Sequence, residues 1–111
     1  MSYRLSQDAD NDLTAIYLHG REMFGRVQAE AYYADLIARF EFLAENPRAA
    51  RERSDMDPPV RVHPSGAHVI IYQLEGSDIV VLGVRHGAKI GRTEAEPAND
   101  YFFAAAMTRN M

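Results

Sequence analysis

The sequence contains no cysteine, only five prolines and seven glycines among its 111 residues, and no long apolar run. Without cysteine it offers no disulfide framework, no thiolate nucleophile and no cysteine-ligated zinc. A membrane-spanning helix needs about 18–20 consecutive apolar residues, which the chain does not have, and its polar opening MSYRLSQDAD is unlike a signal peptide. We therefore expect a cytoplasmic protein without a membrane association.

Basic residues are also scarce. Twelve Lys and Arg stand against sixteen Asp and Glu, which gives a net charge of −4. This balance is not that of a general nucleic-acid binder, and we expect no direct sequence-specific contact with nucleic acid. Residues 61–92 alone are net positive, with four basic and two acidic side chains. Any surface that binds anions is therefore expected in that segment.

Motifs of several enzyme classes are missing as well. The chain has no GxxxxGKS, GxGxxG, HExxH or GxSxG pattern. Its histidines are scattered and lack the close acidic partners of a metal site. They are His19, His63, His68 and His86. The sequence predicts neither a metal site nor a cofactor.

The apolar content of 47% is typical of one globular domain. The first half of the chain has the apolar periodicity of two helices. Residues 3–5 have the pattern of a short strand, and Ser6 suits a helix N-cap. Apolar residues then recur with a 3.6-residue period up to Gly25, and again from about 26 to 45, where Asn46-Pro47 follows. Because almost no loop separates the two helices, they are predicted to form an antiparallel hairpin.

From Val60 onward the apolar period changes to two. Three β runs are predicted at 60–63, 67–74 and 78–85, with turns at 64–66 and 75–77. Two helices followed by three strands give an α+β fold, in which the hairpin packs on a mostly antiparallel sheet. We expect this domain to span residues 1–92. A C-terminal extension, 93–111, is predicted to carry a short tail helix.

One group of side chains has two interpretations. In the first, Arg61 on the first β run and Arg85, His86 and Lys89 at the end of the last converge at one edge of the sheet. In that case they would hold an RNA phosphate, with His86 as general base and the arginines stabilising charge. In the other interpretation Arg61 packs along the sheet and pairs with an acid, while Arg85 and His86 face solvent.

The apolar residues also leave two possibilities open. The predicted strands carry more apolar surface than two helices can cover. In the first possibility, a groove between hairpin and sheet therefore stays open for a partner. Alternatively, the chain's own residues 93–111 fill part of that surface. The apolar side chains of this extension include Tyr101, Phe102, Phe103 and Met107.

Four segments, in this order, resemble the ParE branch of the RelE/ParE toxin family. The opening YRLSQDADNDL is similar to its strand and first helix, and FGRVQAEAYYADLIARFEFLAENP to its aromatic-Gly turn and second helix. VRVHPSGAHVIIY matches the family's Arg, Gly-x-His and closing Tyr, and VRHGAK resembles the end of its last strand. The resemblance covers about residues 3–90. The chain departs from the family at Gly83, where members commonly carry a basic residue.

The resemblance implies the RelE/ParE toxin fold and the toxin component of a type II toxin–antitoxin (plasmid stabilisation) module. Such a toxin would be no enzyme, would poison DNA gyrase, and would be neutralised by a ParD-like antitoxin in a hetero-oligomer. Candidates for the antitoxin groove are Tyr32, Leu36, Phe40, Arg61 and Tyr72. Candidates for target contact are Arg85, His86 and Lys89.

Two alternatives stay open beside the ParE interpretation. The first is a RelE-type, ribosome-dependent mRNA endoribonuclease that uses Arg61, Arg85 and His86. The second is an inactive homologue that binds an antitoxin without toxicity.

Overall fold

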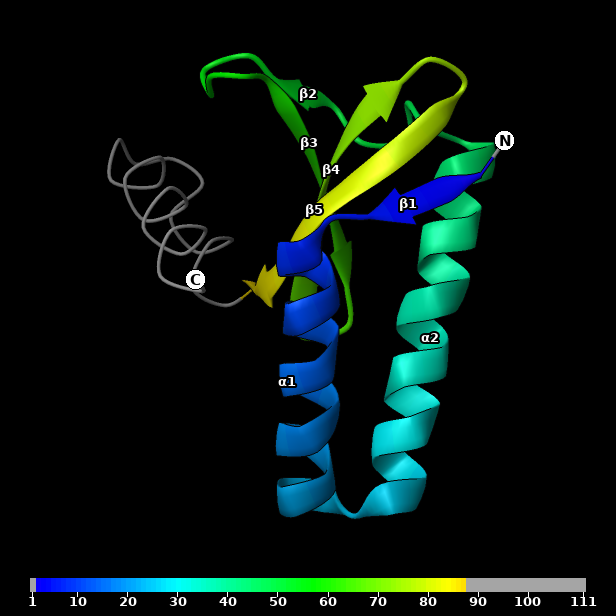
Figure 1. Cartoon of the computed structure of the whole chain (residues 1–111), viewed down its shortest axis with the longest axis vertical. Helices are drawn as coiled ribbons and strands as arrows, with labels where there is room; N and C mark the ends of the chain where they lie inside the picture. Colours follow the sequence, from blue (N-terminus) through cyan, green and yellow to red (C-terminus); the bar gives the residue numbers. More distant parts are fainter. Residues whose placement is uncertain (1, 88–111) are drawn as a thin grey trace.

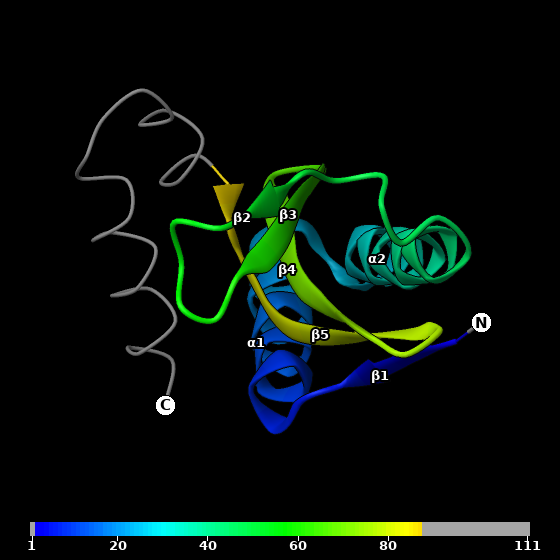
Figure 2. The same cartoon turned by 90° about the horizontal axis from the view of Figure 1, so that it is seen from above.

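The computed structural model describes residues 2–87, which form two layers. A hairpin of two helices covers one face of a five-stranded sheet (Figure 1 and Figure 2). The elements are β1 (Tyr3–Leu5), α1 (Gln7–Phe24), α2 (Arg26–Glu45), β2 (Glu52–Arg53), β3 (Val60–Ser65), β4 (His68–Glu75) and β5 (Asp78–His86). The α+β fold predicted from the sequence is thereby confirmed. Lys89, the extension 93–111 and its predicted tail helix lie outside the described residues.

The sheet has the strand order β1-β5-β4-β3-β2. Its first strand pairs in parallel with its last, so that Tyr3 lies opposite Ile79 and Leu5 opposite Val81. All other neighbours are antiparallel. The sequence does not predict strand β2, because two residues are too few to show a period-two pattern.

Both helices begin and end where the sequence predicts. The Ser6 hydroxyl accepts a hydrogen bond from the Ala9 N–H at 3.0 Å, as an N-cap does. Gly25 alone joins α1 to α2, and the two helices run side by side in opposite directions (Figure 1).

The two β-turns are shorter than predicted. Only two residues separate β3 from β4, and two separate β4 from β5. Pro64 and Ser65 therefore belong to β3 instead of a turn. Proline is tolerated there because β2 pairs only with Val60 and Arg61, which leaves the outer edge of β3 without a strand neighbour at Pro64.

The main core fills the space between the helices and the sheet. Phe40 and Tyr72 belong to it and are fully buried, so their predicted place in an open groove is corrected. Phe40 lies on the inner stripe of α2, where helical period and burial coincide. The Tyr72 hydroxyl donates to the Pro47 carbonyl at 2.8 Å and so holds the chain that leaves α2. A smaller apolar cluster around Ile71 forms separately from this core.

Candidate functional site

Tyr32, in the middle of α2, holds the turn between β3 and β4. The Ala67 N–H donates to the Tyr32 hydroxyl oxygen at 3.0 Å, and that hydroxyl lies 2.6 Å from Nδ1 of His68. The Ser65 carbonyl is 3.3 Å from the same oxygen. Gly66 has a φ of +61°, and a Cβ there would lie 2.8 Å from the Tyr32 ring. Only glycine permits the turn to approach Tyr32 this closely.

The electrostatics of the turn favour a neutral His68. Burial, reinforced by the nearby His86 and His19, lowers the pKa of His68 to about 4. Nδ1 of a neutral His68 accepts a hydrogen bond from the Tyr32 hydroxyl. Burial also raises the pKa of Tyr32, which keeps the phenol protonated. The turn is therefore joined to α2 by an uncharged hydrogen-bond network.

A groove of about 470 Å³ opens on one side of Tyr32, between the hairpin and the end of the sheet. Its walls are mainly apolar. They include Ile16, Phe24, Ala29, Tyr32, His68 and His86. We call this cavity the apolar groove. The apolar groove lies between hairpin and sheet, as the sequence predicts. Of the five residues predicted to line it, only Tyr32 is part of its wall.

Large apolar side chains are exposed near the tip of the hairpin. Phe24, which lines the groove, is 62% exposed. Leu18, Met23 and Val27 near it are 54%, 60% and 81% exposed. Large apolar side chains exposed beside a groove are a common feature of sites where another protein binds.

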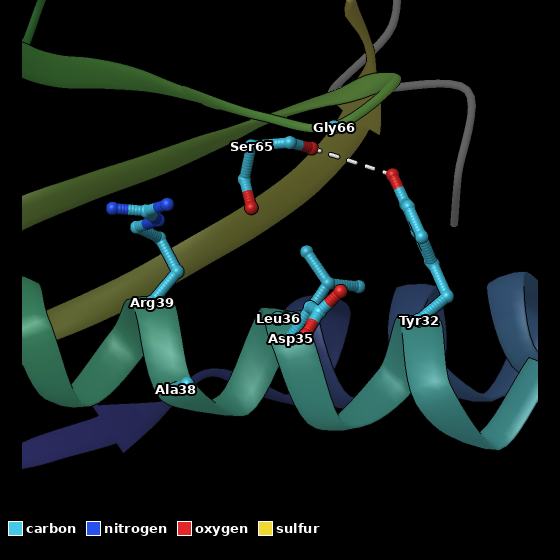
Figure 3. Close-up of a pocket in the computed structure, with 7 residues that line it drawn as sticks. All are labelled: Tyr32, Asp35, Leu36, Ala38, Arg39, Ser65 and Gly66. Atoms are coloured by element: carbon cyan, nitrogen blue, oxygen red, sulfur yellow. Dashed lines mark hydrogen bonds between the residues drawn. The ribbon is translucent and has the colours of Figure 1, made fainter.

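A second cavity, of about 450 Å³, lies on the other side of Tyr32 (Figure 3). It is bounded by α2 and the end of β3, and its lining is polar. Leu36, which the sequence proposes for the groove, lines this cavity and is 1% exposed. We call it the Ser65 pocket.

Arg85 does not face solvent. Its Nη1 atom lies 2.8 Å from Oδ1 of Asp12, and the Val84 N–H donates to Oδ2 of Asp12 at 2.9 Å. Both charged side chains are buried, with Asp12 3% and Arg85 8% exposed. Desolvation raises the pKa of Asp12, and the bonds from Val84 and Arg85 oppose that shift. A Cβ on Gly83 would lie 3.2 Å from the Asp12 carboxylate, so a larger residue there would crowd this pair.

The convergence of Arg61, Arg85 and His86 does not occur. Arg61 lies opposite Tyr72, whereas Arg85 lies opposite Val69 nearer the other end of β4. The Arg61 guanidinium donates to the Ala50 carbonyl at 2.6 Å, and so supports the segment after α2. His86 is exposed at the end of β5, where its ring is 5.5 Å from that of His68. The correction arises because strand register, which the sequence pattern leaves open, separates the two arginines.

Residues 2–87 contain neither a cluster of metal-ligating side chains nor a helix that could span a membrane. No three His, Asp or Glu side chains come together as metal ligands in this part of the chain. Neither helix there is long and apolar enough to cross a bilayer.

The described residues thus form a two-helix hairpin on a mixed five-stranded sheet, with an apolar groove beside it. Residues 3–91 match the family described as "ParE toxin of type II toxin-antitoxin system, parDE". Toxin ParE1 of Caulobacter vibrioides is 32% identical over 84 residues, which cover 76% of this chain and 86% of that protein. The chain therefore belongs to the ParE toxin family.

A solved structure supports the fold independently. The structure described as the chromosomal ParDE TA system from P. aeruginosa has a TM-score of 0.67 to this chain at 23% identity. The match covers 78% of this chain and 95% of that one.

Several residues of the two cavities have no clear signal in the sequence. His68 stands out only as part of the Gly-x-His motif, and nothing in the pattern indicates its bond to Tyr32. His19 and Phe24 look like ordinary residues of an amphipathic helix. Nothing in the sequence distinguishes Arg39 from the other exposed arginines.

Proposed function

We propose that this ParE toxin acts by binding other proteins, as the toxin of a type II pair. In this proposal a ParD-like antitoxin inserts an apolar segment into the apolar groove, and DNA gyrase is the cellular target. The observation that carries the antitoxin half is the groove itself, open between hairpin and sheet and continued by exposed Phe24. The relative named as a ParDE system supports the existence of such a partner.

The chemistry of the groove suits an amphipathic helix. Its walls are mainly aliphatic, aromatic and imidazole groups with one amide, Gln28, and His68 is uncharged near neutral pH. Burying one large apolar side chain contributes about 1.5–3 kcal/mol, so two or three anchors on one helix face give substantial affinity. The exposed Met23 and Phe24 add contact area at the mouth.

The gyrase half of the proposal is supported by family membership and by the positions of the basic residues. Arg85 is bound to Asp12 and Arg61 to the Ala50 carbonyl, so both are used within the fold. Arg85 precedes His86 on β5, but its guanidinium is held by Asp12. Arg61 lies opposite Tyr72, away from His86, so the three do not form the cluster that an RNA-cleaving site requires. The exposed His86 is left as a candidate for contact with the target.

Binding to the antitoxin is tested by titrating the product of the neighbouring reading frame into the purified chain. Phe24→Asp should weaken binding by about tenfold or more, because it places a charge at the mouth of the groove. Tyr33→Asp is the matched control, since Tyr33 is also partly exposed but packs on Tyr17 outside the groove. Equal losses in the two variants would contradict the proposed docking site.

The target is tested by inducing the chain in cells and assaying gyrase supercoiling and cleavage complexes with purified protein. Growth arrest relieved by the neighbouring gene, together with inhibited gyrase, is the expected result. Arrest with unaffected gyrase would overturn the target and leave the antitoxin assignment intact. Tight antitoxin binding without arrest would identify an inactive homologue instead.

A further inference from the structure

The Ser65 pocket is a second cavity that shares a wall with the apolar groove. It is lined by Tyr32, Asp35, Leu36, Ala38, Arg39, Ser65 and Gly66. Tyr32 belongs to both cavities. A partner segment that leaves the groove along α2 therefore crosses Tyr32 and enters this pocket.

Ser65 is the buried polar group of the pocket. The residue is 8% exposed, and its hydroxyl is directed into the cavity (Figure 3). Its carbonyl oxygen lies 3.3 Å from the Tyr32 hydroxyl oxygen, and no side chain among residues 2–87 bonds to the Ser65 hydroxyl. The hydroxyl is therefore available inside the cavity as a hydrogen-bond donor to a polar occupant.

Arg39 supplies a positive charge at one end of the pocket. Its side chain rises from α2 beside Ser65 (Figure 3), and its guanidinium carbon is 5.4 Å from the centre of the Phe42 ring. Within the described part of the chain Arg39 has no ion pair. A guanidinium held on an aromatic ring still has its edge donors available for a carboxylate.

Asp35 adds a negative charge between Arg39 and Tyr32, one helical turn before Arg39 on α2 (Figure 3). Its charge contributes to the raised pKa of Tyr32. The pocket therefore carries charges of both signs, with hydrogen-bond donors at Ser65 and Arg39. An acidic group bound at the Arg39 end is attracted by Arg39, whereas Asp35 repels an acid placed nearer Tyr32.

We propose that the Ser65 pocket binds an acidic side chain of the antitoxin, a glutamate or an aspartate. One carboxylate oxygen accepts from the Ser65 hydroxyl and the other from the Arg39 guanidinium. The acid comes from the same segment whose apolar residues fill the groove, so the inference rests on the proposed antitoxin binding. Together the two cavities select a segment in which an acidic residue follows apolar anchors.

The test is the affinity of the full chain for the neighbouring gene's product, measured by calorimetry for matched variants. Arg39→Gln should weaken binding by roughly tenfold, since it removes a hydrogen bond to a charged group. Ser65→Ala should weaken it by roughly threefold. Arg26→Gln is the control, because Arg26 is also exposed on α2 but lies outside the pocket. Its Nε atom is 3.7 Å from Oε2 of Glu30. It should stay within about twofold, the effect of an exposed pair.

A double-mutant cycle identifies the acid itself. Each Asp and Glu of the antitoxin is changed to its amide, and one of these changes should have no further effect when Arg39→Gln is present. If the antitoxin binds but Arg39→Gln behaves like Arg26→Gln, this inference is overturned and the proposed function stands. If the antitoxin does not bind the wild-type chain, both are overturned. Thermal melts of each variant, expected to match the wild type, separate lost contacts from lost folding.

Discussion

At the scale of single residues, the phenol of Tyr32 joins α2 to the turn between β3 and β4. Tyr32→Phe removes the bonds to Ala67 and His68 while keeping the ring that packs on Gly66. We expect it to lower the free energy of unfolding by about 1–3 kcal/mol, measured by urea denaturation. Tyr33→Phe, on the outer side of the same helix, should change it little. Similar losses for the two variants would contradict the role given to Tyr32.

His68 makes the stability of the fold depend on pH. The unfolded chain takes up this proton near pH 6.5 but the folded chain only near pH 4. Between these values the unfolded state binds more protons, so the free energy of unfolding falls as the pH is lowered from 6.5 toward 4. Because His68 is partly exposed, we expect a loss on the order of 1–2 kcal/mol.

The histidine dependence is checked by repeating the denaturation series with His68→Gln. The variant should show a flatter profile over the same acidic range. His63 retains a smaller slope of the same sign, since burial and the charge of Arg39 lower its pKa too. A profile as steep as that of the wild type would show that His68 is not responsible.

The sequence predicts residues of the site unevenly. Gly66, His68 and Tyr32 belong to segments that resemble the family, and the structure brings them together. The pattern places Ser65 in a three-residue turn, whereas the turn has two residues. Along a strand one residue decides which face a side chain lies on, so the burial of Ser65 depends on a boundary that the pattern does not resolve.

At the scale of elements, residues at the start of α1 form hydrogen bonds with the edge of β5 beyond the point where β1 stops pairing. The Ser6 N–H donates to the Val81 carbonyl at 2.9 Å, and the Ser6 hydroxyl to the Leu82 carbonyl at 3.1 Å. The Asp12 carboxylate then accepts from the Val84 N–H. Helix side chains thereby satisfy backbone groups that a longer first strand would otherwise pair.

Removing the Asp12 carboxylate should destabilise this edge strongly. Asp12→Ala removes the carboxylate that the buried Arg85 guanidinium contacts and the acceptor of the Val84 N–H. The expected loss is about 2–4 kcal/mol in chemical denaturation. Asp12→Asn keeps one acceptor and should lose less. Asp10→Ala, an exposed change in the first turn of the same helix, should lose well under half as much.

The elements themselves are largely predictable from the sequence. Capping at Ser6, the break at Gly25 and Asn46-Pro47 define both helices, because these signals are local. Residue patterns do not predict the pairing of β1 with β5, since nothing in three residues indicates their distant neighbour. The buried bond between Asp12 and Arg85 is unpredictable for the same reason. Partners this far apart in sequence are chosen by the packing of the whole sheet.

At the scale of the whole molecule, the apolar groove and the exposed hairpin tip should make measured stability depend on the partner. A ligand that binds only the folded state at 100 times its Kd adds about 2.7 kcal/mol. For a domain of this size that corresponds to a rise in Tm of roughly 10–20 °C, followed by circular dichroism. Phe24→Asp should reduce the shift under identical concentrations. An unchanged Tm with excess antitoxin would contradict binding to the folded chain.

The place of β1 in the sheet has a consequence for synthesis. Ser6 bonds to Leu82 across a separation of 76 residues. Strand β1 therefore has no pairing partner until β5 has been synthesised. At a translation rate of about 5–20 residues per second, that wait is roughly 4 to 15 s. During this interval a nascent chain carries its helices without a completed sheet beneath them. The apolar groove, which includes His68 and His86, is therefore complete only after β5 has been synthesised.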